Sequence, residues 1–280
     1  MGNMQDITRD PSWVGTLNAY LKPHWDKLLL GEWAQAVGSG RMTVEEMRGW
    51  MLQIYPFIHA FPKFLAEALI KVEDDYSRSF LIDNIRVEKA HAEHWIWMGM
   101  GFGLSSEDMI DLAEGNRSVL RDVQSLTDWL WYINTKGSLA EAVAATSYAI
   151  EGVTGDLSRK VISGFESYRG HPGVDFGPKT YKWMREHTRY DDAHPKIALE
   201  IVTRYATTER LQKRVMLAAK RSLQLLDQAL ETSFRAYTPN AGASVDLDLR
   251  SSERRSLKKP IKFPDRRIRE RRGFAMRSVA

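Results

Sequence analysis

The chain has 280 residues and a hydrophobic content of 43%, enough for one large packed domain or two small ones. It contains no cysteine, which excludes disulfides, thiolate metal sites and a cysteine nucleophile, and is consistent with the cytoplasmic location that we expect. The net charge of +4 is uneven, because residues 249–280 carry twelve Lys or Arg against three Asp or Glu. The preceding 248 residues are therefore acidic, with a net charge of −5.

The sequence predicts neither a signal peptide nor a membrane-spanning helix. Residues 1–6 show neither the basic nor the apolar stretch of a signal peptide. No uncharged apolar run approaches the roughly 18 residues that a membrane span needs. We therefore expect no membrane span.

Apolar residues recur at helical spacing from residue 11 onward. Residues 11–38 predict a helix that Pro23 interrupts and a glycine-rich turn ends. Residues 43–71 begin with a capping-box pattern and continue as a strongly amphipathic helix, which Pro56 and Pro62 should kink.

The same spacing continues to residue 237. It predicts helices over 74–101, 105–134 (a short one, then a longer one), 138–167 and 196–237, the last with a break near Thr207-Thr208. No alternating strand pattern is present, so we expect an all-α fold, a compact bundle of seven or eight helices over residues 1–237. Residues 238–280 are polar and basic, and they predict a disordered tail.

One motif, H-x3-D-x2-H, suggests a metal site. It consists of His187, Asp191 and His194, and on a single helix residues three and four apart share a face. Pro195 cannot continue a regular helix without losing a hydrogen bond, so the chain kinks there or a new helix begins near Asp191 or Asp192. Two imidazoles and a carboxylate suit iron, manganese or zinc. The alternative is a solvated polar turn.

Two other helices offer the missing ligands. Glu88 and His91 form an E-x2-H pair, the spacing that places both ligands of carboxylate-bridged di-iron bundles on one face, whereas His94 fits that face less well. Glu151 is a lone carboxylate in a small, apolar helix, which is unfavourable unless it is metal-bound or paired with an Arg across the bundle. The inventory suits two octahedral irons with open positions: Glu88, His91, Glu151, His187, Asp191 and His194.

At these residues the sequence resembles the haem-oxygenase-like di-iron oxidases, which share a fold superfamily with the TenA thiaminases and the pyrroloquinoline-quinone synthase. The resemblance covers about residues 12–236 and rests on E-x2-H, on the Glu of S-Y-x2-E and on H-x3-D-x2-H. The stretches 24–32 and 53–57 are similar to the early helices of the superfamily. The E-x2-H spacing is nearest to the 1-alkene-forming fatty-acid decarboxylase branch. Other branches separate the first Glu and His further, which keeps His94 open as a ligand.

The resemblance implies an oxidation that uses Fe(II), two ions per chain, with dioxygen as co-substrate. The substrate class it implies is a fatty acid, an amino acid or an amine; one iron, or manganese, remains an alternative. An external electron donor could take part. We expect no catalytic group beyond the metal ligands, and a homodimer as the commonest soluble assembly. Four residues are candidates for the substrate pocket: Tyr55, His59, Tyr148 and Tyr190.

Three other interpretations compete with this one. The first is a cofactor-free or thiaminase-like member of the same fold, although the thiaminase route needs a cysteine that the chain lacks. The second is a haem oxygenase with His24 as axial ligand, which leaves the six candidate ligands unexplained. The third is a non-catalytic interaction protein whose basic tail binds nucleic acid, an anionic membrane surface or an acidic partner. The acidic body argues against nucleic acid as the main partner.

Overall fold

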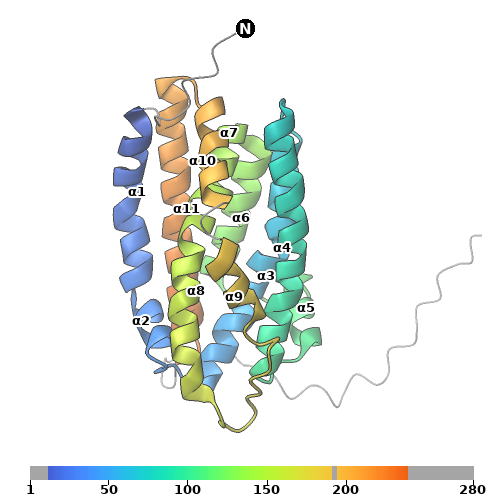
Figure 1. Ribbon diagram of the computed structural model, residues 1–280. Helices are drawn as coiled ribbons and strands as arrows, with labels where there is room; N and C mark the ends of the chain where they lie inside the picture. The colour runs from blue at the N-terminus through green and yellow to red at the C-terminus, as the bar shows by residue number, and fades with distance from the viewer. Residues whose placement is uncertain (1–11, 191–193, 239–280) are drawn as a thin grey trace, which may run out of the picture. The chain divides into compact units, whose positions relative to one another are not determined.

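The computed structural model describes residues 12–190 and 194–238, where helices run alongside one another and are joined by turns and loops (Figure 1). No strand occurs within these two ranges. The predicted all-α bundle is therefore confirmed. The basic tail predicted over 238–280 lies, apart from Thr238, outside the described residues.

The helices follow the predicted segments closely, with several of them divided. The first part of the chain forms α1 (Ser12–Leu30), α2 (Glu32–Gly38), α3 (Val44–Leu69), α4 (Asp75–Gly101), α5 (Ser106–Ala113) and α6 (Arg121–Lys136). The second part forms α7 (Leu139–Val143), the π-helical turn η1 (Ala144–Tyr148), α8 (Glu151–Phe165), the 3-10 turn η2 (Glu166–Tyr168), α9 (Lys182–Tyr190), α10 (His194–Tyr205) and α11 (Glu209–Arg235).

The predicted interruption at Pro23 is wrong, because α1 continues through this residue. Pro23 lies on the exposed side of the helix, where water can hydrogen-bond the carbonyl that the proline leaves unpaired. On the opposite side Leu17, Leu21 and Leu28 are buried and hold the helix against the bundle. Tertiary packing therefore outweighs the local preference.

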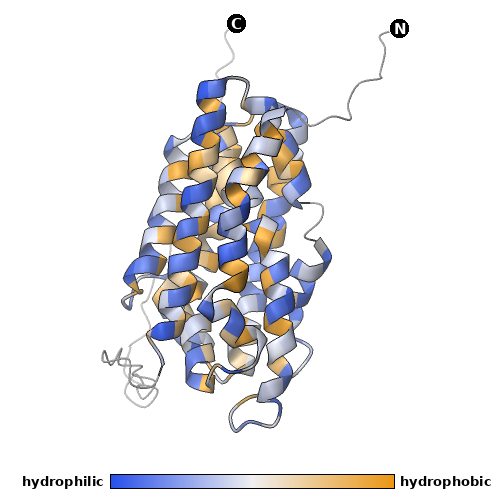
Figure 2. Ribbon diagram, turned by 90° about the vertical axis from the view of Figure 1, so that its left-hand side faces the viewer, coloured by the Kyte–Doolittle hydropathy of each residue, from blue (hydrophilic) through white to orange (hydrophobic). Residues whose placement is uncertain are grey.

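Helices α3 and α4 carry much of the core. The predicted capping box starts α3: the Thr43 side chain accepts from the Glu46 backbone N–H at 3.1 Å, and the Glu46 carboxylate accepts from the Thr43 N–H at 2.7 Å. Helix α3 packs against α4, α5, α6 and α11, and Trp50 and Phe64 are almost fully buried in these contacts. Figure 2 shows hydrophobic residues alternating with hydrophilic ones along the helices, the pattern of one buried and one exposed face.

Two breaks in the second half of the bundle position the later elements. Helix α10 ends at Tyr205, and Thr208 caps the start of α11, which confirms the break predicted near Thr207-Thr208. The helix predicted over 138–167 is instead divided by the π-helical turn η1. The buried alanines of that turn allow neighbouring helices to approach closely. No helix in the described part is both long and apolar enough to cross a bilayer.

Candidate metal centre

Helix α4 presents the first two candidate ligands side by side. Glu88 and His91 lie one turn apart on the buried face of α4, and the His91 Nδ1 is 3.1 Å from a Glu88 carboxylate oxygen. Asp74 caps the start of this helix by accepting from the Ser77 N–H at 2.9 Å. The E-x2-H pair is thus held on a long, capped helix, as its spacing predicts.

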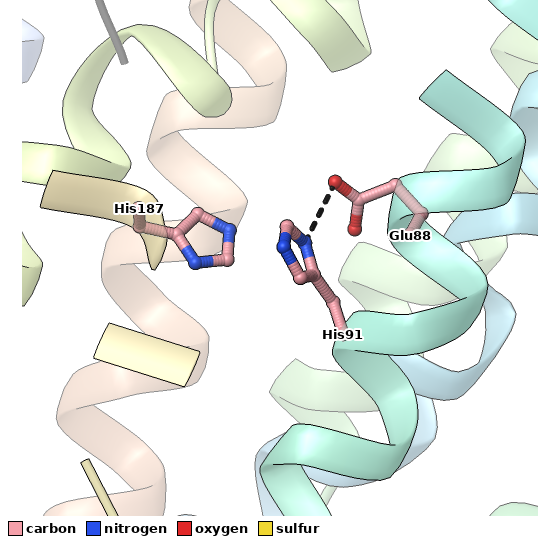
Figure 3. A group of neighbouring side chains, drawn as sticks. All are labelled: Glu88, His91 and His187. Carbon is pink, nitrogen blue, oxygen red and sulfur yellow. Dashed lines mark hydrogen bonds and ion pairs between the residues drawn. The ribbon is translucent and has the colours of Figure 1, made fainter. Parts of the chain in front are cut away.

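Helix α9 brings His187 to face this pair (Figure 3). The rings of His187 and His91 have centroids 4.2 Å apart, and ligand atoms of Glu88, His91 and His187 all lie within 4.8 Å of one another. The Nδ1 of His187 lies 2.8 Å from the carbonyl oxygen of Trp183, which can only accept, so Nδ1 donates. The available lone pair of His187 is then on Nε2. In this tautomer Nε2 can bind a metal while the hydrogen bond from Nδ1 to the backbone holds the ring in place.

The electrostatics of this group follow from its burial. Burial lowers the pKa of His187 well below its ordinary value, and the nearby His91 lowers it further, so this imidazole is neutral. Burial raises the pKa of Glu88, with Glu151 adding to the effect and His91 opposing it. Burial also acts to lower the pKa of His91, but the carboxylates of Glu88, Glu186 and Glu151 together outweigh it and the pKa is raised. Nitrogen and oxygen donors in this proportion suit a divalent transition metal.

Glu151 and His194 form a second pair beside the first. Glu151 follows the π-helical turn η1, a local irregularity that often occurs at functional sites. One carboxylate oxygen accepts from the Asn84 side-chain amide at 3.1 Å, and the other lies 3.2 Å from the His194 Nδ1. Among the described residues Glu151 thus contacts an amide and an imidazole, and the alternative of an ion pair with Arg is not found.

The structure describes only the two ends of the H-x3-D-x2-H motif. His187 belongs to α9, while His194 is the first residue of α10 and Pro195 lies in its first turn. Residues 191–193 between them lie outside the described part, so the placement of all three ligands on one helix and the alternative of a new helix that begins near Asp191 or Asp192 both stay predictions. Asp191 and the side chain of Tyr190 lie outside the described part of the chain, and their predicted roles stay predictions.

A third grouping includes Glu186, which the spacing of the motifs did not predict. The His94 Nδ1 lies 2.6 Å from a carboxylate oxygen of Glu186, and the His91 Nε2 lies 3.7 Å from the same oxygen. Ligand atoms of these three residues again lie within 4.8 Å of one another. Glu186 directly precedes His187, and successive helix positions point about 100° apart, so the spacing alone gave no reason to group them.

A pocket in the bundle opens onto the first two groups of ligands. Glu88, Glu151 and His187 contribute to its wall. Its free volume of about 70 Å³ has room for more than one water molecule. Large rings dominate the remaining wall: Trp33, Trp50, Trp95, Trp183, Phe57 and Phe61. The candidate ligands therefore border an apolar chamber.

Three of the four predicted pocket residues have described side chains, and these three lie elsewhere. The Tyr55 hydroxyl is 3.4 Å from the Nδ1 of His59, whose Nε2 is 3.4 Å from the Lys63 amine. The Tyr148 hydroxyl bonds Asn18, and its ring packs against Trp25 at a centroid distance of 5.8 Å. None of Tyr55, His59 and Tyr148 is among the described residues that line the pocket beside the ligands.

Comparisons with known proteins agree on a family and a fold. A sequence profile described as iron-containing redox enzyme matches residues 48–227. The chain is 27% identical over 173 residues to a 4-aminobenzoate synthase of Chlamydia muridarum, covering 59% of this chain and 69% of that protein. It is 27% identical over 162 residues to a 4-aminobenzoate synthase of Chlamydia trachomatis, covering 56% and 66%.

Solved structures give the same fold. A TenA homologue from Pseudomonas syringae pv. tomato superposes with a TM-score of 0.72 at 28% identity, covering 84% of this chain and 98% of that chain. A domain of unknown function with a haem-oxygenase-like fold from Shewanella denitrificans gives a TM-score of 0.69 at 19% identity, covering 85% and 98%. The all-α fold of the haem-oxygenase-like type that the sequence predicted is therefore confirmed.

Proposed function

The chain belongs to the family of iron-containing redox enzymes, and on this premise we propose that it oxidises a small organic substrate with Fe(II) and dioxygen. The observation that carries the proposal is the convergence of three buried candidate ligands, Glu88, His91 and His187, of which Glu88 and His187 line an apolar pocket. Such a pocket keeps bulk water away from both the ligands and the substrate.

The proposed metal positions follow the two groups of side chains. Glu88, His91 and His187 would hold one iron, while Glu151 and His194 would hold the second together with Asp191. Bound iron would supply the binding and reduction of dioxygen. The protein contributes the orientation: the Trp183 carbonyl fixes the tautomer of His187, and the Asn84 amide holds one oxygen of Glu151.

The wall of the pocket favours an apolar substrate that carries a hydrogen-bond acceptor. The described lining residues include neither Lys nor Arg. The indole N–H groups of Trp33, Trp50 and Trp183 have no hydrogen-bond partner in the described part, and an indole can only donate. An acid or carbonyl group would accept from such donors, whereas a protonated amine would not. Among the expected substrate classes we therefore favour a fatty acid or another apolar acid.

A second candidate is the formation of an aminobenzoate. The two relatives at 27% identity are both 4-aminobenzoate synthases, and the aromatic walls of the pocket suit a flat ring. Product analysis separates the candidates, because one yields 4-aminobenzoate and the other consumes an added acid.

The first test is metal content and oxygen uptake. We expect protein loaded anaerobically with Fe(II) to retain about two irons per chain and to consume oxygen when fatty acids, and ascorbate as an electron donor, are added. His187→Ala should lower both, whereas His171→Ala, which changes an exposed histidine, should lower neither. Retention well below one iron per chain, unchanged by His187→Ala, would refute an iron oxidase and favour a cofactor-free member of the fold.

A further inference from the structure

Two sets of candidate ligands share one histidine. The inner set is Glu88, His91 and His187, and the outer set is His91, His94 and Glu186. The His91 Nδ1 lies 3.1 Å from Glu88, and its Nε2 lies 3.7 Å from Glu186. The same imidazole therefore faces each set with a different nitrogen.

The exposure of these side chains decreases along a path into the bundle. The Glu186 side chain is 24% exposed, that of His94 is 7% exposed and that of His91 is 5% exposed. Glu88 and His187, the remaining members of the inner set, are buried. A cation that approaches from solvent therefore meets the Glu186 carboxylate first.

The contact between His94 and Glu186 is not a well-formed hydrogen bond. Their Nδ1 and carboxylate oxygen are 2.6 Å apart, yet the buried Nδ1 has no partner in hydrogen-bonding geometry within the described part. A buried polar atom whose close contact lacks hydrogen-bond geometry is only partly satisfied, and in a native protein this needs an explanation. A cation bound between the imidazole nitrogen and the carboxylate would satisfy both atoms.

We propose that His94 and Glu186 form an entry site, where a divalent transition-metal ion from solvent binds first and from which it passes to the inner set across His91. This inference rests on the proposed function, in which the inner set holds a resident iron. Without His91 the outer set keeps only two ligands, so an ion there is held more weakly than in the inner set. Two histidines and one carboxylate suit Fe(II) and the related divalent ions.

A lysine beside the entry site should affect the rate of metal uptake in the opposite direction to Glu186. The Lys182 amine lies 3.8 Å from the other carboxylate oxygen of Glu186 and over the ring of Trp97, 5.3 Å from its centroid. Its positive charge repels an incoming cation and competes for the carboxylate. Removal of Glu186 should therefore slow metal uptake, and removal of the Lys182 charge should accelerate it.

The test follows anaerobic Co(II) binding by stopped-flow absorption in the full chain. Glu186→Gln and His94→Gln should each slow association about tenfold, in line with the effect of local charge on association rates. Lys182→Gln should accelerate it about twofold. Glu93→Gln is the matched control, since this exposed glutamate lies beside His94 on α4, and its rate should stay near that of the parent. The number of Co(II) ions bound at equilibrium should be the same in all four variants.

Three results would overturn the entry site. Association rates that Glu186→Gln leaves unchanged would remove the route. A lower number of bound ions, or faster dissociation with unchanged association, would make Glu186 a resident ligand or a residue that orients His91. A parent protein that binds no Co(II) would overturn the proposed function as well, which separates the two failures. Far-UV circular dichroism checks folding, Glu186→Asp should restore part of the rate, and the opposite effect of Lys182→Gln cannot arise from misfolding.

Discussion

Helix α4 and the α9–α10 segment supply opposite sides of the candidate site, and they are built differently. Helix α4 has 27 residues, a side-chain cap at its start and an extensive interface with α3. Helix α9 has 9 residues and lies against α4 and α8 (Figure 1). Part of this contact is made by residues of the site itself, because the rings of His187 and Trp183 pack against His91 and Trp95. The fold thus fixes the α4 ligands, whereas a metal would contribute more to holding α9.

The largest effect is expected when one candidate ligand is removed from each side of the site. Glu88→Gln on α4 and His187→Ala on α9 should each weaken the binding of Co(II) more than about a hundredfold, beyond the range seen for residues that only orient a ligand. Competition against a chromophoric chelator measures the affinity. His171→Ala provides the exposed control. If only the α4 variant loses affinity, His187 is not a ligand and α9 does not belong to the site.

Metal binding should stabilise α9 more than α4. At a hundredfold excess over the dissociation constant, a metal stabilises the folded chain by about 2.7 kcal/mol. For a domain of this size, that corresponds to a rise in Tm of about 5–10 °C. Hydrogen exchange should show the added protection mainly in residues 182–190. Equal gains in protection over residues 75–101 would mean that both sides form together, and would contradict the comparison.

Two tryptophan substitutions test the difference between α4 and α9 through side-chain packing. Trp183 stacks on His187 with a centroid distance of 3.8 Å, whereas Trp95 donates to the Met51 carbonyl oxygen at 2.8 Å within the α3–α4 core. We expect Trp95→Phe to lower the free energy of unfolding by about 1–3 kcal/mol, because it loses volume and a hydrogen bond in the scaffold. It should affect metal affinity less than Trp183→Phe, because in the described part the ring of Trp95 contacts α9 through Trp183 and not through a candidate ligand. Trp183→Phe should instead weaken Co(II) binding and have little effect on the free energy of unfolding. Urea unfolding and Co(II) titration of both variants measure the two effects, and equal effects in both variants would contradict the division.

The scaffold was more predictable from the sequence than the later part of the site. The capping box at Thr43 and the E-x2-H pair on α4 depend on residues at most three apart, so local spacing is sufficient to place them. The π-helical turn before Glu151 and the contact between Glu186 and His94 depend on how distant helices approach each other, and spacing along the chain carries no information about that.

The tyrosines singled out for the pocket illustrate the same limit. Tyr55 is buried on the amphipathic helix α3, but helical periodicity does not say which cavity a buried ring borders. Tyr55 contacts His59 instead of the pocket beside the ligands. The course of the chain through H-x3-D-x2-H shows a related limit, because Pro195 permits either a kink or a new helix start and spacing alone does not decide between them.

The smallest expected effect is a sensitivity to alkaline pH that belongs to the scaffold alone. Burial, with a smaller contribution from the charge of Glu114, raises the pKa of Tyr55 from 10.0 to about 12. The contribution of this tyrosine to stability is fully present below pH 10.0 and is lost as the pH rises toward 12, because in that window the unfolded chain releases the proton while the folded chain retains it.

Urea midpoints measured across that window should therefore fall with pH, and Tyr55→Phe should make the fall shallower. Tyr237, whose pKa is also raised by burial, remains in the variant and preserves part of the slope. Since Tyr55 lies on α3 and does not border the pocket beside the ligands, the change in slope should be the same in chelator-treated and metal-loaded protein. A change in slope that depends on the metal would mean that the scaffold and the site are coupled, and the two sides would then not be as independent as their packing indicates.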